Sequence, residues 1–211
     1  MALETPLDSI LDAGSKVRIL RLFSLRTDDF LASGREIARA TALSPPAAHS
    51  ALKELLDQSL LVREIIGRQH VYRLNPAHRV VREMLRPLFL KERGLKQDVR
   101  VFLLRELGAS GLMGSVMSLI LYGSLASGKT HEASDCDVAV VALDASSKFA
   151  LDRFFTQTLA ARFHAEFGFH VDPYIKTAAE FRRKLGKNEP PVSTLMANYE
   201  TLHGKDPMDL M

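Results

Sequence analysis

Residues 118–140 read SLILYGSLASGKTHEASDCDVAV. The apolar run before Gly123 predicts a strand, and Gly123-Ser124 predicts the turn from that strand into a short helix. After a loop, an apolar run that begins at Asp135 predicts a second strand. Because side chains alternate along a strand, Asp135 and Asp137 share one face, about 7 Å apart, where both carboxylates can bind the same divalent cations.

The same segment also satisfies the phosphate-binding pattern G-x-x-x-x-G-K-[ST], with Gly123 followed by Gly128-Lys129-Thr130. A P-loop needs a helix that starts at Lys129-Thr130, so that its backbone amides hold the phosphates. Residues 131–134 alone separate Thr130 from the next predicted strand, and they leave no room for that helix. A P-loop NTPase is therefore disfavoured, and the strand–turn–strand interpretation is preferred.

This segment resembles the DNA polymerase β-like nucleotidyltransferase superfamily, and most closely its minimal nucleotidyltransferase (MNT) branch. The signature of that branch is hydrophobic-Gly-Ser, a spacer, then Ser-Asp-x-Asp and an apolar run. It is matched here by residues 121–124, Gly128 and residues 134–140, and the resemblance covers about residues 100–206. It implies a C-terminal nucleotidyltransferase domain that contains a small mixed sheet flanked by helices.

The resemblance further implies a third carboxylate on a later strand. Asp172 supplies it within residues 169–175, and Pro173 predicts an edge strand or the end of a strand. The implied catalytic and metal-binding residues are Asp135, Asp137 and Asp172, which would hold two Mg²⁺ ions, with Asp172 also a candidate general base.

The implied reaction is the transfer of a nucleoside monophosphate from an NTP, with ATP the expected donor, to a hydroxyl group. Gly123, Ser124 and Lys129 would bind the nucleotide phosphates. Many members of the family carry an arginine where this sequence has Ser127. Lys129 can supply a charge there but not the bidentate fork of a guanidinium, so the nucleotide affinity and the acceptor stay open.

Three interpretations of this domain follow from the resemblance. The first is a transferase that modifies a hydroxyl on a protein or a small molecule. The second is a non-catalytic domain that senses a nucleotide for a transcriptional regulator. The third is an antitoxin-like subunit that modifies a partner protein. Cys136 is interpreted as a buried strand residue and not as a nucleophile.

The N-terminal part predicts three helices and a hairpin. Ser33 and Glu36 form a capping box that opens a helix over residues 34–40, and Ser44-Pro45 opens the next. The second of these helices has an apolar stripe at Ala48, Ala51, Leu52, Leu55 and Leu56. Its opposite face carries small or hydrogen-bonding side chains suited to the floor of a major groove, namely Ala47, His49, Ser50 and Lys53. Two β-like runs then flank a turn at residues 67–69.

Helix, helix, helix and hairpin form the order of a winged helix-turn-helix. The sequence resembles the winged-helix regulators of the MarR and ArsR type over about residues 14–75, through residues 35–38, 51–55, 60–63 and 67–75. The resemblance implies binding to double-stranded DNA, with Ala47, His49, Ser50 and Lys53 at the bases and Arg68 at the phosphates or minor groove. It also implies a homodimer. A winged helix that contacts only proteins is the alternative.

The predicted fold class is therefore α/β (α+β), with a winged helix-turn-helix domain at residues 1–75, a helical connection at 76–108 and a nucleotidyltransferase domain at 109–211. Pro87 and Gly94 are expected to interrupt the helical connection.

The composition agrees with this organisation. Among the 211 residues, 46% are hydrophobic and 25% charged, as in soluble globular proteins, and a single cysteine fits a reducing compartment. No apolar run approaches 18 residues and no signal peptide is recognised, so no membrane contact and a cytoplasmic location are expected. The net charge of +3 arises in residues 1–90, which hold 13 Lys and Arg against 10 Asp and Glu, and this tilt favours an anionic partner for the N-terminal part.

Overall fold

The computed structural model describes residues 4–128 and 135–210. The chain has an α+β fold and divides into two compact units, Met1–Leu95 and Lys96–Met211. The domain boundaries predicted after residues 75 and 108 stay predictions. Within the described ranges, no helix is both long and apolar enough to cross a lipid bilayer.

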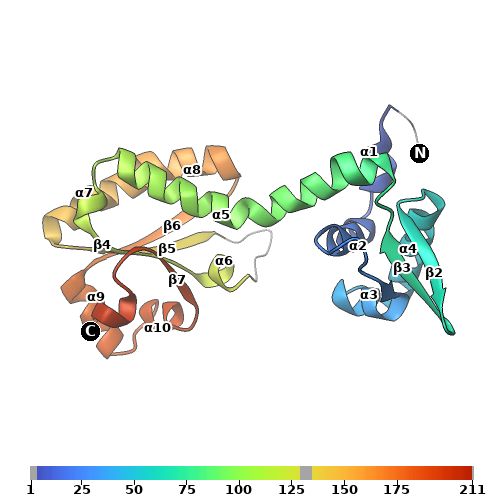
Figure 1. Cartoon of the computed structure of the whole chain (residues 1–211). Coiled ribbons are helices and arrows are strands. Elements are labelled where there is room, and N and C mark those ends of the chain that lie inside the picture. The colour runs from blue at the N-terminus through green and yellow to red at the C-terminus, as the bar shows by residue number, and fades with distance from the viewer. Residues whose placement is uncertain (1–3, 129–134, 211) are drawn as a thin grey trace. The chain divides into compact units, whose positions relative to one another are not determined.

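The first unit has the element order of a winged helix-turn-helix (Figure 1). Its helices are α1 (Pro6–Ile10), α2 (Gly14–Ser24), α3 (Gly34–Ala40) and α4 (Pro45–Asp57). Its strands are β1 (Ala32–Ser33), β2 (Leu61–Ile66) and β3 (Gln69–Leu74), which pair antiparallel in the order β1-β3-β2. The predicted hairpin is confirmed, whereas the short strand β1 is not among the predicted elements.

The two helix starts predicted from capping residues are confirmed. The Ser33 N–H donates to Glu36 Oε2 at 2.8 Å and the Glu36 N–H donates to Ser33 Oγ at 3.4 Å, which completes the capping box. Ser44 caps α4, and Pro45 is its first residue. The predicted apolar stripe of α4 is buried at Ala48, Ala51, Leu52 and Leu55, so the opposite face of this helix is left to solvent.

The helical connection differs from the prediction at Pro87 and Gly94. A π-helical turn (Val81–Leu85) leads into α5 (Arg86–Ala109), which continues through both residues without a break. A proline ring meets the carbonyl of the residue four positions earlier in a regular α-helix, and here the wider π turn precedes it. Gly94 costs about 1 kcal/mol relative to alanine, which is too little by itself to end the helix.

The second unit contains a mixed four-stranded sheet in the order β6-β5-β4-β7. Its strands are β4 (Val116–Tyr122), β5 (Cys136–Ala142), β6 (Val171–Thr177) and β7 (Tyr199–Gly204). β5 and β6 are parallel, and β4 is antiparallel to both β5 and β7. The short helix α6 (Gly123–Ser127) follows β4 directly. Pro173 lies on the edge strand β6, as predicted.

Helices cover both faces of this sheet (Figure 1). One face packs against the last turns of α5 and against α7 (Ala145–Arg153), a π-helical segment (Phe154–Leu159) and α8 (Ala160–Phe167). The other face packs against α9 (Ala178–Gly186) and α10 (Val192–Leu195). Short 3-10 turns at Met113–Ser115 and Pro207–Leu210 complete the unit. Because both faces are covered, the apolar run Val138–Ala142 is fully buried.

Candidate functional site

Two carboxylates are neighbours on adjacent strands of the second unit. The parallel register of β5 and β6 pairs Asp137 directly with Asp172. Adjacent strands lie about 4.8 Å apart, so these side chains meet although 35 residues separate them in the sequence. Ala139 and Val141 continue the same side of β5 into the core under α9 and α10, which assigns the carboxylates to that face.

Asp135 lies two residues before Asp137, and its charge acts on the Asp137 carboxyl group. It is exposed and precedes the first residue of β5, whereas Asp137 is half-buried. All three predicted carboxylates therefore lie at one end of the sheet, where β4 passes into α6. The sequence predicts their strands, and the pairing of β5 with β6 brings Asp172 to the other two.

The backbone at Gly123 approaches the Asp137 carboxylate so closely that only glycine fits. Gly123 has φ +71°, in the left-handed region, and a Cβ there would lie 1.9 Å from Asp137 Oδ2 and 2.8 Å from Asp137 Cγ. The next residue, Ser124, donates its backbone N–H to the Asp137 carboxylate. The Gly123-Ser124 turn thus holds Asp137 in place through one hydrogen bond and one close contact.

The electrostatics of this end of the sheet reflect crowded negative charge. The pKa of Asp137 is raised, first by burial and then by the charges of Asp172 and Asp135, while the Ser124 N–H opposes the shift. Burial, Asp137 and Asp172 raise the pKa of Tyr122 to about 12. Tyr122 is the last residue of β4 and only 7% exposed. It borders the carboxylates as a neutral phenol. Its place in the sequence does not reveal this role, because an aromatic residue at a strand end is usually part of the core.

The donor set of this cluster fits Mg²⁺. Among residues 4–128 and 135–210, no group of three or more His, Cys, Asp and Glu side chains is placed to hold a metal ion. Mg²⁺ does not require such a group, since it keeps several waters and binds through one or two carboxylates together with substrate phosphates. Asp137 and Asp172 offer oxygen ligands, and a cation would relieve the repulsion that raises the pKa of Asp137.

The structure also bears on the remaining predicted residues of this segment. Lys129 lies outside the described residues. Ser127 donates its hydroxyl to the Ser124 carbonyl at 3.0 Å. Cys136 is fully buried, and burial raises its pKa to about 12, so the thiol is not a nucleophile.

The P-loop alternative does not fit the observed helix. A P-loop helix begins after the second glycine of the motif, but α6 begins at the first, Gly123. Gly128 ends α6 in the left-handed conformation with φ +69°. β5 then begins at Cys136, so the order strand, turn, short helix and strand is the one preferred from the sequence.

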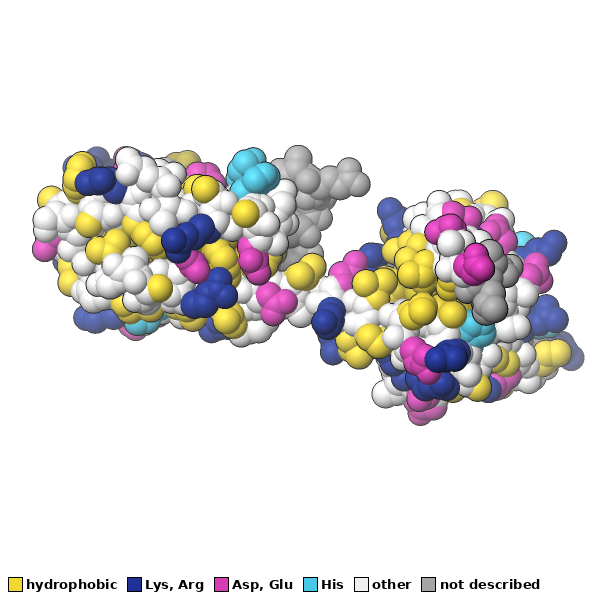
Figure 2. Space-filling view, turned by 90° about the horizontal axis from the view of Figure 1, so that it is seen from above, with side chains coloured by type: hydrophobic (Ala, Val, Ile, Leu, Met, Phe, Trp, Pro, Cys, Tyr) yellow, Lys and Arg dark blue, Asp and Glu magenta, His cyan; other side chains and the backbone are white. Residues whose placement is uncertain are grey.

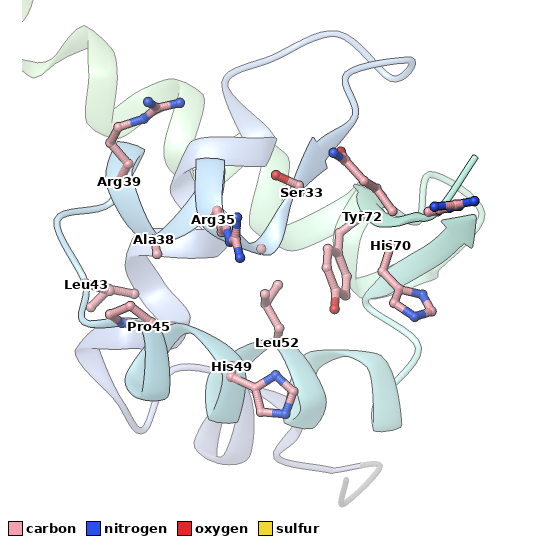
Figure 3. Close-up of a pocket in the computed structure, with 13 residues that line it drawn as sticks. Ser33, Arg35, Ala38, Arg39, Leu43, Pro45, His49, Leu52, His70 and Tyr72 are labelled. Carbon is pink, nitrogen blue, oxygen red and sulfur yellow. The ribbon is translucent and has the colours of Figure 1, made fainter. Parts of the chain in front are cut away.

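The first unit carries a second candidate site, a basic groove between α3, α4 and the β2–β3 hairpin (Figure 3). Its volume is about 900 Å³, and its described lining contains no Asp or Glu. The basic side chains of this lining are Arg35, Arg39, His49, Arg68 and His70. Arg35 extends toward the centre of the groove, and Tyr72 and His70 border it on the hairpin side (Figure 3).

Two of the predicted DNA-contacting residues, His49 and Arg68, line this groove. Lys53 lines an adjoining hollow together with His49 and Arg63. Ala47 is half-buried, and Ser50 is exposed and donates to Glu54 at 3.4 Å. Arg35, Arg39 and His70 are absent from the predicted set. The signal for the two arginines is their place on the exposed face of α3, beside the predicted helix that faces the bases.

Comparison with known proteins supports the assignment of the second unit. Residues 104–193 match the family model described as "Nucleotidyltransferase domain". No curated protein matches the chain.

Three solved structures show weak similarity. One is a homodimeric winged helix-turn-helix DNA-binding domain from Mycobacterium bovis, described as a possible ArsR-family transcriptional regulator. It is 21% identical, with 42% of this chain and 73% of that chain covered and a TM-score of 0.31. The others are a toxin–antitoxin with AMP-PNP, 18% identical, and a mutant of the toxin–antitoxin MntA-HpeT, 16% identical. For each of these, 52% of this chain and 77% of that chain are covered and the TM-score is 0.33.

Proposed function

We propose that the chain is a DNA-binding protein that carries a Mg²⁺-dependent nucleotidyltransferase site, which transfers a nucleoside monophosphate from an NTP to a hydroxyl acceptor. The observation that carries the enzymatic part is the pairing of Asp137 with Asp172 beside a glycine that no other residue can replace. A backbone contact this close restricts position 123 to glycine and holds the Asp137 carboxylate in one place. Such a restriction is useful where a functional carboxylate must be positioned accurately.

In this proposal Asp135, Asp137 and Asp172 bind two Mg²⁺ ions, and Gly123, Ser124 and Lys129 bind the nucleotide phosphates. Bound Mg²⁺ would offset the negative charge of the triphosphate and of the leaving pyrophosphate, and it would lower the pKa of the acceptor hydroxyl. Asp137 provides a carboxylate oxygen fixed by the Ser124 N–H. Asp172, which is exposed on the edge strand, is the carboxylate most open to the acceptor and the candidate general base.

The test is incubation of the full chain with ATP labelled on the α-phosphate, Mg²⁺ and candidate acceptors, with pyrophosphate release and label transfer as readouts. Asp137→Asn should abolish both, because it removes a ligand charge without changing the side chain's size. Asp152→Asn is the matched control, since Asp152 is an exposed carboxylate on α7 in the same unit. Equal activity in wild type and Asp137→Asn would overturn the enzymatic assignment.

The same assay distinguishes this proposal from two alternative functions. A nucleotide sensor for a transcriptional regulator would bind labelled ATP without releasing pyrophosphate. An antitoxin-like subunit would transfer the label only when its partner protein is added. We propose ATP as the donor and the cytoplasm as the location, because both DNA and ATP are present there.

The proposed DNA interface is the basic groove together with the exposed face of α4. Guanidinium and imidazole groups on three elements surround a hollow whose described lining has no carboxylate, which suits a phosphate backbone. Ala47, His49, Ser50 and Lys53 would face the bases, and Arg68 would contact phosphate or the minor groove. A gel shift with genomic fragments tests this, and binding that does not depend on salt would contradict it.

We further propose that the chain forms a homodimer through the first unit. Hydrophobic side chains gather on the surface of this unit (Figure 2). Exposed hydrophobic residues of the unit include Met84, Leu88, Leu90 and Leu95. An apolar hollow between α2 and α5 is lined by Val17, Leu88 and Leu95. Light scattering coupled to size-exclusion chromatography tests it, and a monomer at micromolar concentration would refute it.

A further inference from the structure

The exposed face of α2 has an unusual composition. One face of α2 carries residues at helical spacing, and the same spacing continues into the residues that follow the helix. These residues are Arg18, Arg21, Leu22, Leu25 and Arg26. The opposite side of the helix is buried through Ile19, Leu20 and Phe23. A solvated helix face usually mixes charges of both signs, whereas this one combines three arginines with two partly exposed leucines.

This face forms one wall of a hollow of about 450 Å³ in the first unit. The end of α3 contributes Ala40 and Thr41, and α5 contributes Arg93. The hollow therefore has four arginines around three apolar side chains. It shares no lining residue with the basic groove proposed for DNA, so the two are separate sites.

One of the four arginines is fixed by protein contacts. Arg21 donates two hydrogen bonds to Glu92, at 2.6 and 2.7 Å, and lies over the Phe89 ring. Arg26 lies over the Phe30 ring. Within the described part of the chain, Arg18, Arg26 and Arg93 form no ion pair, so three positive charges surround the hollow without a protein counterion.

We propose that this hollow binds a polyphosphate chain, either free or carried by a nucleotide. All of its cationic side chains are arginines, whose planar fork matches phosphate oxygens in pairs. Its volume lies within the range of small-molecule pockets, and Leu22 and Leu25 give it an apolar floor. Duplex DNA presents a convex backbone that is better matched by a long surface than by a hollow of this size.

Titration calorimetry on the full chain tests the proposal, with sodium tripolyphosphate and ATP as separate probes in buffer that contains EDTA. Without divalent ions the carboxylates at Asp135, Asp137 and Asp172 repel phosphate, so the assay reports on other sites. We expect one saturable site per chain. Arg18→Gln and Arg93→Gln should each weaken it about tenfold or more, because each removes a charge-assisted contact. Arg93→Lys should bind as weakly as Arg93→Gln, since an ammonium group lacks the planar fork of a guanidinium.

Arg183→Gln is the matched control, because Arg183 is an exposed arginine on α9 of the other unit, and it should bind like wild type. Binding of tripolyphosphate supports a free polyphosphate, and saturable binding of ATP alone supports a nucleotide. Three results would each overturn the proposal: binding that does not saturate, an equally large loss of affinity in Arg183→Gln, or Arg18→Gln and Arg93→Gln variants that lose affinity for duplex DNA alone.

Discussion

Replacing Gly123 with alanine is expected to remove nucleotidyl transfer while leaving the chain folded. The added Cβ would lie 1.9 Å from Asp137 Oδ2, and a Cβ essentially never lies closer than 3.0 Å to such a neighbour. The carboxylate must therefore retreat by about 1 Å. A displacement of about 1 Å in a catalytic group can reduce the rate about 100-fold, and this is the expected loss in pyrophosphate release.

Gly128→Ala is the matched control for this variant. Gly128 also has a left-handed backbone, with φ +69°, but a Cβ there meets nothing within 4 Å. Both substitutions should cost about 1–2 kcal/mol of stability through the backbone, which is seen as a loss of a few degrees in Tm. Only Gly123→Ala should lose Mg²⁺-dependent activity beyond that effect. Equal activity in the two variants would refute the argument that the turn positions Asp137.

Three further predictions follow from the contacts described above. Burial and the neighbouring acids raise the pKa of Asp137, so the folded chain binds more protons there than the unfolded chain, and stability is lost as pH rises through the folded pKa. Asp137→Asn should therefore raise the Tm of the metal-free chain at pH 7 and leave it unchanged at a pH below the unfolded pKa. A lower Tm of this variant at pH 7 would contradict the prediction. Lys16, only 2% exposed, donates to Ser9 O at 2.7 Å and pairs with Asp12 at 2.6 Å and Glu54 at 3.0 Å. Lys16→Ala should destabilise the first unit by about 2 kcal/mol in urea unfolding. Arg79→Ala breaks an exposed pair and should leave the free energy of unfolding nearly unchanged, and an equal loss in both variants would show that burial does not matter here. Arg68→Ala and Lys53→Ala should each weaken DNA binding and lower the slope of log K against log salt by about 1, as measured by fluorescence anisotropy at several salt concentrations; an unchanged slope in both would place the DNA elsewhere.

Local patterns predict the elements of this chain well because their causes are local. The capping box at Ser33 and the Gly123-Ser124 turn depend on residues within a few positions of each other. Pro173 restricts β6 to a sheet edge because it lacks an N–H. The wrong expectation at Pro87 has a local cause too, but it depends on a π turn that the sequence pattern does not reveal.

The arrangement of the candidate sites depends on contacts between distant segments. The pairing of Asp137 with Asp172 requires the parallel register of β5 and β6, which side-chain alternation alone does not give. The distance between a Gly123 Cβ and Asp137 likewise follows from β4 lying beside β5. Arg35 and His70 lie in one groove because α3 packs near the hairpin, and no spacing in the sequence relates them.

A crystal structure of the full chain with Mg²⁺ and a non-hydrolysable NTP analogue tests the proposed catalytic site. We expect two Mg²⁺ ions about 3.5–4 Å apart, bound to Asp135 and Asp137, with Asp172 on one of them and the triphosphate against Gly123 and Ser124. An analogue bound away from these residues, or metal ions without a carboxylate ligand from Asp137, would contradict it.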